Sequence, residues 1–329
     1  MRRREFILAG AAATAWPVVA RAQQADRMRR LGVLFATSER DPDTPARLAA
    51  MREELQRLGW REGKNLRIDV RYGDGDTGLI QDRASELVAS GPEVILILGT
   101  VVAHAVQKLT HSISVVFVQV SDPVQARFVS SLARPSGNMT GFTTYEYSVA
   151  GKWLEVLKET VPGITRILLL LNPENTEQWV GYREALATFA PRAGVKFVPG
   201  PVRDRAEIAA AIASFSSEPN GGLLVPPDAI LSTNRQLIVS LAEQYHLPAI
   251  FPYRSGPASG GLLSFGIDVV DQFRRATGYV DRILRGEKPS ELPVQAPTDF
   301  KLVINLKTAK ALGIEIPQTV MARADEVIE

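Results

Sequence analysis

Small polar side chains gather where predicted strands give way to helices. Four such junctions are present: Gly99-Thr100, Ser121-Asp122-Pro123, Asn172-Pro173-Glu174-Asn175 and Pro226-Pro227-Asp228. At the carboxyl ends of parallel strands, unpaired amides and the positive ends of helix dipoles point into a crevice. Facing one another across a cleft, these groups can hold a small molecule through amides, hydroxyls and carboxylates. Helix capping explains any one junction, whereas the set of four favours a binding site.

A glycine-rich segment, Gly73-Asp74-Gly75-Asp76-Thr77-Gly78, matches the G-x-G-x-x-G dinucleotide pattern. However, it follows the second predicted strand, and Asp74 and Asp76 would lie where a pyrophosphate must sit. The spacing and terminal glutamate of an EF-hand calcium loop are also absent. We therefore interpret the segment as a solvated connecting loop, and we expect neither a cofactor nor a metal.

Catalytic signatures are scarce in this sequence. It contains no G-x-S-x-G elbow, no G-x-x-x-x-G-K loop and no H-E-x-x-H motif. It has only three histidines and no cysteine, which excludes disulfides, thiolate metal sites and a cysteine nucleophile. This pattern favours binding over catalysis, so we expect no enzyme.

The elements that must position the polar junctions alternate strictly between strand and helix. The first series has predicted strands at 31–36, 66–72, 94–98 and 115–120, and helices at 44–58, 79–89, 101–110 and 123–132. The second has helices at 148–160, 177–192, 204–215 and 232–245, and strands at 166–171, 195–199, 222–225 and 248–251. A tail follows with strands at 261–265 and 301–304, helices at 268–285 and 305–312, and an extended stretch at 289–299.

The polarity of the strands indicates how their sheets are covered. Residues 66–72 alternate apolar and charged side chains, as in an edge strand with one exposed face. Residues 94–98 and 115–120 are mostly continuous apolar runs, typical of parallel strands covered by helices on both faces. The pattern predicts an α/β protein of two Rossmann-like, doubly wound parallel-sheet units.

The first 22 residues have the three parts of an export signal. Arg3-Arg4-Glu5-Phe6 supplies a basic start of the twin-arginine type, Ala9 to Ala20 an uncharged run, and Ala20-Arg21-Ala22 a small-x-small cleavage site. Cleavage after Ala22 would remove four arginines and one glutamate, which changes the formal net charge from +2 to about −1. We expect an exported chain without a lipid anchor, since no cysteine is present, and no nucleic-acid or membrane-surface partner.

Several segments, in their order and spacing, resemble the periplasmic solute-binding components of ABC importers, specifically the tryptophan/tyrosine-type group related to TrpX. The resemblance spans the chain that follows the signal. The segments are Leu31 to Leu34, Ile97 to Thr100, Val115 to Val124, Gly137 to Gly141, Leu170 to Asn175, Val225 to Asp228, Leu247 to Phe251, Gly260 to Gly266, Leu292 to Gln295 and Asn305 to Ile314.

The resemblance implies a type I periplasmic-binding-protein fold, in which a hinge of three crossovers joins two lobes. We expect crossovers near 143–148, 252–256 and 294–300. The N-terminal lobe would comprise residues 27–145 plus 256–296, and the C-terminal lobe residues 146–255 plus 297–329. By position, the ligand contacts would fall on Ser38, Thr100, Ser121 and Asp122 of the first lobe and on Asn172, Asn175 and Asp228 of the second.

Three further residues have two readings each. Tyr145 and Tyr253 lie near crossovers and would either stack on an aromatic ligand or pack the hinge. Arg254 would either clamp a ligand carboxylate or form a hinge salt bridge.

The expected function is capture of an amino acid or aromatic carboxylate by lobe closure in the periplasm. A monomer would deliver this solute to an inner-membrane ABC permease and its ATPase. Two alternatives stay open: an exported ligand-sensing subunit of a receptor and an exported α/β enzyme.

Overall fold

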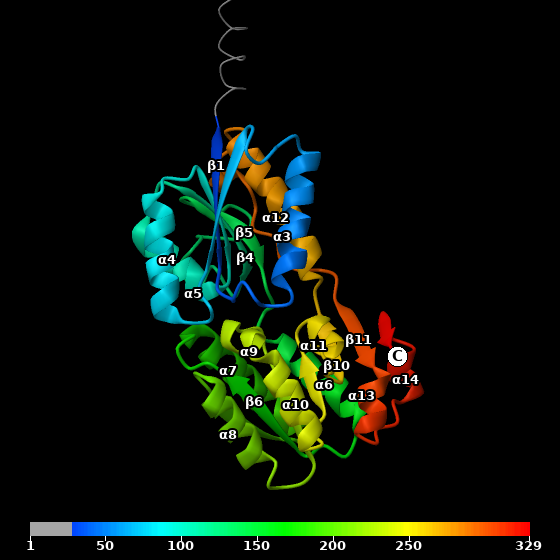
Figure 1. Cartoon of the computed structure of the whole chain (residues 1–329). Coiled ribbons are helices and arrows are strands. Elements are labelled where there is room, and N and C mark those ends of the chain that lie inside the picture. Colours follow the sequence, from blue (N-terminus) through cyan, green and yellow to red (C-terminus); the bar gives the residue numbers. More distant parts are fainter. Residues whose placement is uncertain (1–27) are drawn as a thin grey trace, which may run out of the picture.

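Two α/β lobes make up the described part of this chain, residues 28–329 of the computed structural model, and they stand one above the other (Figure 1). The predicted signal, residues 1–22, lies outside the described residues. Each lobe has one sheet with helices on both faces. The predicted fold class is therefore confirmed.

The first lobe has a parallel sheet of five strands in the order β2-β1-β3-β4-β5. The strands are β1 (Arg29–Phe35), β2 (Leu66–Tyr72), β3 (Val94–Leu98), β4 (Ser114–Val120) and β5 (Met139–Thr143). Strand β2 lies at the edge, as its alternating pattern predicted, and every residue of β3 is buried. Helices α4 (Thr77–Ala89) and α5 (Thr100–Leu109) cover one face, and α3 (Thr44–Arg57) and α12 (Val269–Leu284) cover the other (Figure 1).

The second lobe has seven strands in the order β12-β11-β10-β9-β8-β6-β7. They are β6 (Arg166–Leu171), β7 (Lys196–Pro201), β8 (Gly221–Leu224), β9 (Ala249–Phe251), β10 (Leu263–Gly266), β11 (Lys301–Asn305) and β12 (Glu326–Ile328). All neighbouring strands run parallel except β10 and β11. On β6, Leu168 and Leu170 face one core while Ile167 and Leu169 face the other, so both faces of the sheet are buried.

Helices also sandwich the second sheet. Helices α6 (Val149–Thr160) and α7 (Thr176–Arg192) pack on one face, and α8 (Arg205–Phe215), α9 (Ala229–Thr233) and α10 (Arg235–Gln244) pack on the other. The remaining short elements are α11 (Ser255–Ala258), the 3-10 turn η1 (Pro289–Glu291), α13 (Leu306–Ala311) and α14 (Gln318–Met321).

The chain crosses between the lobes three times, at residues 144–148, 267–268 and 297–300. Tyr145, from the first crossing, ties the three together. Its hydroxyl donates to the Pro252 carbonyl at 2.7 Å and accepts from the Ile267 amide at 3.0 Å. Its ring lies 5.8 Å from that of Phe300 in the third crossing. Tyr145 is buried and therefore packs the hinge.

The second crossing differs from the expected one near residue 256. Strand β10 pairs with β9 and β11, so residues 256–266 belong to the second lobe. Only α12 and the segment through η1 return to the first lobe, where α12 packs on α3, β3 and β4. The reason is amphipathicity: α12 buries Phe273, Ala276 and Val280 along one face, and this stripe completes the first core.

Two local expectations were wrong. Residues 123–132 form turns instead of a helix, because Asp122 and Arg127 take φ values of 33° and 59°, which interrupt a right-handed helix. The predicted helix 232–245 is divided at Asn234, which ends α9 and begins α10. In addition, strand β5 was missing from the predicted elements. At Gly141, φ is +152° and an added Cβ would lie 2.0 Å from the Phe117 carbonyl oxygen, so this glycine permits the close approach of β5 to β4.

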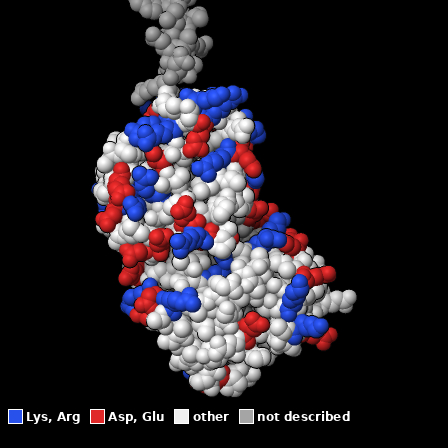
Figure 2. Space-filling view, in the orientation of Figure 1, with Lys and Arg blue, Asp and Glu red and all other residues white. Residues whose placement is uncertain are grey.

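Charges of both signs are interspersed over the visible face of the first lobe, and much of the second lobe carries few charges there (Figure 2). Within residues 28–329, no helix is both long and apolar enough to span a bilayer. The same residues contain no cluster of three or more side chains suited to holding a metal ion.

Candidate ligand-binding site

The two sheets present the carboxyl ends of their strands to one another, and a small cavity lies between them. In the first lobe the strand order reverses between β1 and β3, and in the second between β6 and β8. Ligands of open α/β sheets bind outside the carboxyl ends of strands at such switch points. The cavity, of about 60 Å³, is lined from these ends by Thr37, Thr100, Asn172 and Asp228. We call it the central cleft.

Polar atoms without partners converge on the central cleft from both lobes. Thr37 Oγ1 and Gln119 Nε2 come from the first lobe, and Asn175 Oδ1 and the Tyr253 hydroxyl come from the second. All four atoms are buried and have no hydrogen-bond partner in the described protein. Buried polar groups are nearly always paired, so this concentration indicates a site where a ligand supplies the missing partners.

Backbone strain places one of these side chains. Gln119 has a φ of 57°, and the register of β4 against β5 shifts between Val118 and Val120. This bulge turns the Gln119 side chain toward the central cleft. A non-glycine residue in the left-handed region costs roughly 1–3 kcal/mol and recurs at functional sites. The strain therefore supports a binding role for this residue.

Asp228 supplies an acidic group to the second lobe's wall of the central cleft. It caps α9 by accepting from the Ile230 amide at 2.8 Å and the Leu231 amide at 3.4 Å. Burial raises its pKa from 3.8 to about 6, although these amides act in the opposite direction. The carboxyl is thus held in an environment where an ammonium group of a ligand would stabilise its charged form.

The glycine-rich segment contributes to the central cleft, which corrects its reading as a solvated loop. The Gly75 amide donates to the Ala36 carbonyl at 2.8 Å, and Gly75 and Thr77 line the cavity. Asp76 caps α4 by accepting from the Leu79 amide at 2.7 Å. The glycines therefore allow a tight turn at the cleft rather than a phosphate cradle.

Contacts between the lobes surround the central cleft. The Thr77 hydroxyl donates to Glu174 at 3.0 Å, and Gln178 Nε2 donates to the Ser121 hydroxyl at 3.2 Å. His104 Nε2 lies 2.9 Å from a Glu177 carboxylate oxygen. These pairs join α4, α5 and the end of β4 to α7 and the loop before it, so they exist only when the lobes are together.

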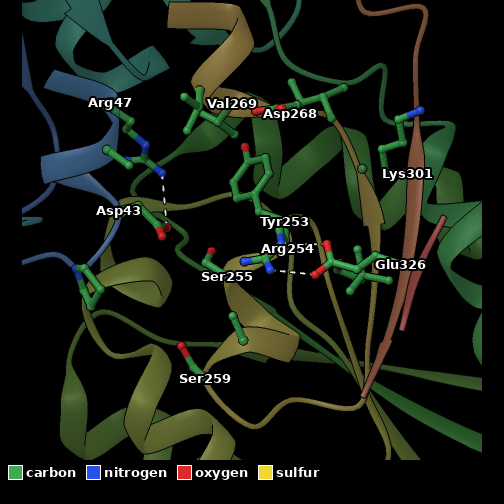
Figure 3. A pocket seen from close by; sticks show the side chains of 18 of the residues that line it. Asp43, Arg47, Tyr253, Arg254, Ser255, Ser259, Asp268, Val269, Lys301 and Glu326 are labelled. Atoms are coloured by element: carbon green, nitrogen blue, oxygen red, sulfur yellow. Dashed lines mark hydrogen bonds and ion pairs between the residues drawn. The ribbon is translucent and has the colours of Figure 1, made fainter. Parts of the chain in front are cut away.

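A second, larger hollow lies beside the second crossing and shares Arg47 and Tyr253 with the lining of the central cleft (Figure 3). This outer groove, of about 740 Å³, lies between α3 and the N-terminus of α12 on one side and α11, β11 and β12 on the other. Arg254 donates twice to Glu326 there, at 2.7 and 2.6 Å. Lys301 lies 3.2 Å from Asp299. Because these charges are paired, whereas unpartnered polar atoms from both lobes meet in the central cleft, the central cleft is the better candidate for ligand capture despite its smaller volume.

The structure brings together half of the side chains that sequence reasoning named. Thr100, Asn172, Asn175, Asp228 and Tyr253 line the central cleft. Ser38, Ser121, Asp122, Tyr145 and Arg254 do not. Whether the first five contact a ligand stays a prediction.

The other five make contacts within the protein that explain their positions without a ligand; those of Tyr145 are described above. The Ser38 hydroxyl accepts from the Arg40 amide, and Asp122 accepts from the Gln125 amide. Ser121 is fully buried, and its amide donates to the Thr100 hydroxyl. Arg254 forms the salt bridge to Glu326 that was its alternative reading. These residues cap turns or join elements.

Several polar or charged lining residues were missed, among them Thr37, Arg47 and Gln119. Gln119 had a usable signal, since it is the one polar residue inside the apolar run 115–120. Thr37 follows a predicted strand directly and belonged with the other junction residues. Nothing in the local sequence marked Arg47 as a lining residue, because an arginine near the start of a helix is normally expected to be exposed to solvent.

Two α/β lobes joined by three crossings, with a polar cleft at the facing strand ends, define a type I solute-binding protein. A family model described as "ABC transporter substrate binding protein" matches residues 42–328. The chain therefore belongs to this family, whose members are substrate-binding proteins of transporters, and the predicted resemblance is confirmed.

Individual relatives agree with this assignment. A protein named "Tyrosine-binding protein" from Clostridioides difficile is 26% identical over 79% of this chain and 74% of its own length. A Streptococcus pneumoniae ABC domain in complex with L-Trp is 27% identical, with a TM-score of 0.83 over 92% of this chain and 100% of that one. A ligand-free, open substrate-binding protein from Clostridium difficile is 25% identical, with a TM-score of 0.64 over 92% and 99%.

Proposed function

We propose that this protein captures an L-amino acid with an aromatic side chain in the central cleft and passes it to an ABC permease. The observation that carries the proposal is the set of unpartnered polar atoms that meet there from both lobes. The ligands named for two relatives, tyrosine and L-Trp, support an aromatic amino acid. We extend the prediction that the chain is not an enzyme, since its family consists of substrate-binding proteins.

The chemistry of the central cleft suits the two charged ends of an amino acid. Asp228 offers a carboxylate to the ammonium group, and Asn175 lies on the same wall. From the first lobe, Thr37 and Gln119 offer a hydroxyl and an amide donor. A ligand that touches both walls binds more tightly when the lobes are together, so its binding energy favours closure.

The arrangement of the lobes supports a hinge-closing mechanism. At nearly equal identity, this structure is more similar to the L-Trp complex than to the ligand-free, open relative, with TM-scores of 0.83 and 0.64. Its lobes thus have the arrangement of the bound relative. A cavity of about 60 Å³ is below the roughly 300–1,000 Å³ usual for ligand sites. The central cleft must therefore widen, through movement of the lobes, to accept and hold an aromatic amino acid.

The cellular setting is part of the same proposal. Residues 1–22 would direct export by the twin-arginine route and be removed after Ala22, leaving a periplasmic monomer without a lipid anchor. The closed surface would then be recognised by the permease and its ATPase in the inner membrane. A receptor-docking sensor subunit and an exported enzyme remain the alternatives that the following experiment addresses.

Thermal unfolding of the purified protein with each L-amino acid tests the function. We expect one or a few aromatic amino acids to raise the midpoint temperature of unfolding. At a free ligand concentration of a hundred times Kd, binding should add about 3 kcal/mol to the free energy of unfolding. Calorimetry should give one site per chain with the compound recovered unchanged. Loss of the compound during incubation would favour the enzyme, and no shift with any amino acid would contradict the proposed ligand. Co-purification with a permease, rather than with a receptor, would support the transport role.

A further inference from the structure

Arg47 is a buried cation with one side-chain hydrogen-bond partner in the described protein, although the charge of the buried Asp41 carboxylate also acts on it, and it lines both the central cleft and the outer groove. It lies on the first turn of α3, and its side chain is only 4% exposed (Figure 3). Its one ion pair, from Nη2 to Asp43 Oδ2, is long at 3.4 Å. Its Nε has no hydrogen-bond partner in the described protein. A guanidinium has five N–H donors, so most of its hydrogen-bonding capacity is unused.

The Asp43 carboxylate is held more firmly by another arginine. Arg235, on α10 of the second lobe, donates to the same Asp43 Oδ2 at 2.9 Å. The Arg235 side chain is fixed by the hydroxyls of Ser255 and Ser259, at 3.0 and 3.2 Å. It also lies 3.8 Å from Asp41. Arg235 therefore competes with Arg47 for the nearest acid.

This competition depends on lobe closure. Asp41, Asp43 and Arg47 belong to the first lobe, whereas Arg235 belongs to the second. When the lobes are apart, Arg47 is the cation left beside Asp43. When they are together, Asp43 is shared: Arg235 holds it at 2.9 Å and Arg47 only at 3.4 Å, while Arg47 lines the central cleft. A buried, incompletely paired cation is costly unless an anion completes it.

We propose that Arg47 binds the carboxylate of the solute, and that the Asp43–Arg235 pair, formed on closure, frees Arg47 to do so. This inference rests on the proposed function, since it names the group that recognises one end of the ligand. Arg254, the arginine suggested by the sequence, is 63% exposed and already donates twice to Glu326. Arginine suits the task because its planar donors match a carboxylate in a bidentate fashion.

The test compares acids with their neutral amides. Affinities of L-tryptophan and L-tryptophanamide, or of the amino acid found above and its amide, are measured by calorimetry for wild type and Arg47→Gln. We expect wild type to prefer the acid, and Arg47→Gln to weaken acid binding by about 10- to 100-fold while changing amide binding little. Arg254→Gln, the matched control in the outer groove, should leave both affinities unchanged.

The role of the interlobe pair needs its own variants. Arg235→Gln should return Asp43 to Arg47 and so lower the ratio of acid to amide affinity. The double variant that carries Asp43→Asn together with Arg235→Gln lacks the competing carboxylate, and it should restore that ratio. A merely structural role for Arg235 would weaken acid and amide equally and would show no restoration, which would refute the coupling.

Failure of the two proposals can be told apart. If no amino acid binds, the proposed ligand is wrong, and the Arg47 inference is then tested with carboxylates that lack an amino group, such as indole-3-acetate and phenylacetate. Binding of these acids to wild type but not to Arg47→Gln would support the inference. Equal losses of acid and amide in Arg47→Gln, or a wild type that binds no carboxylate, would overturn it.

Discussion

Replacing Asp228 by asparagine should stabilise the ligand-free protein at neutral pH. The Asp228 carboxyl has a pKa of about 6 in the folded protein, because burial disfavours its charge, against 3.8 ordinarily. This difference in pKa lowers the free energy of unfolding by about 3 kcal/mol at a pH where Asp228 is ionised in both the folded and the unfolded protein. The value is an upper one, because the side chain is only partly buried. Asparagine caps helices as well as aspartate does, so the substitution should remove the charge while keeping the cap of α9.

The sign of the effect follows from proton uptake. As pH falls through about 6, the folded wild type takes up a proton before the unfolded chain does, so the cost disappears between pH 6 and 4. Urea unfolding at several pH values should therefore show Asp228→Asn more stable than wild type at pH 7.5. The gap, meaning the difference in free energy of unfolding between variant and wild type, should close by pH 4. Asp204→Asn, at the exposed cap of α8, is the control and should show no such gap. A gap independent of pH, or a less stable Asp228→Asn, would refute the reasoning.

Three further predictions concern the hinge, the first sheet and the rim of the cleft. Tyr145→Phe removes the hydroxyl that joins two crossings and should lower the free energy of unfolding by roughly 1–3 kcal/mol in urea. Gly141→Ala should lower the melting temperature severely, whereas Gly163→Ala, with open space around its Cβ position, should change it little; similar effects would contradict the packing argument. Thr77→Val removes the interlobe hydrogen bond to Glu174 and should speed ligand dissociation in stopped-flow by about 2- to 10-fold, and a change confined to association would count against it.

Much of the fold was predictable because local patterns agree with it. The apolar run 94–98 became a fully buried central strand, and the alternating residues 66–72 became an edge strand. Polar residues that follow strands, such as Thr100, Asn172 and Asp228, line the central cleft, because parallel strands all present their carboxyl ends at the same edge of the sheet. These outcomes follow from periodicity and chain direction, which are local properties.

Other features depended on contacts between distant segments. The strand predicted at 261–265 was assigned to the first lobe, and only the pairing of β10 with β9 and β11 places it in the second. Tyr145 had two readings until its hydroxyl met Pro252 and Ile267.

The sequence by itself determined the α/β class, the two-unit organisation and the junctions from which a binding site is built, because strand and helix periods are written into consecutive residues. Only the tertiary structure decided which charges are paired. Arg254 is paired twice with Glu326, whereas Arg47 shares Asp43 with Arg235, which lies 188 positions later and contacts that carboxylate across the lobe boundary. Pairing of charges is a property of three-dimensional proximity, which no spacing along one helix or strand encodes.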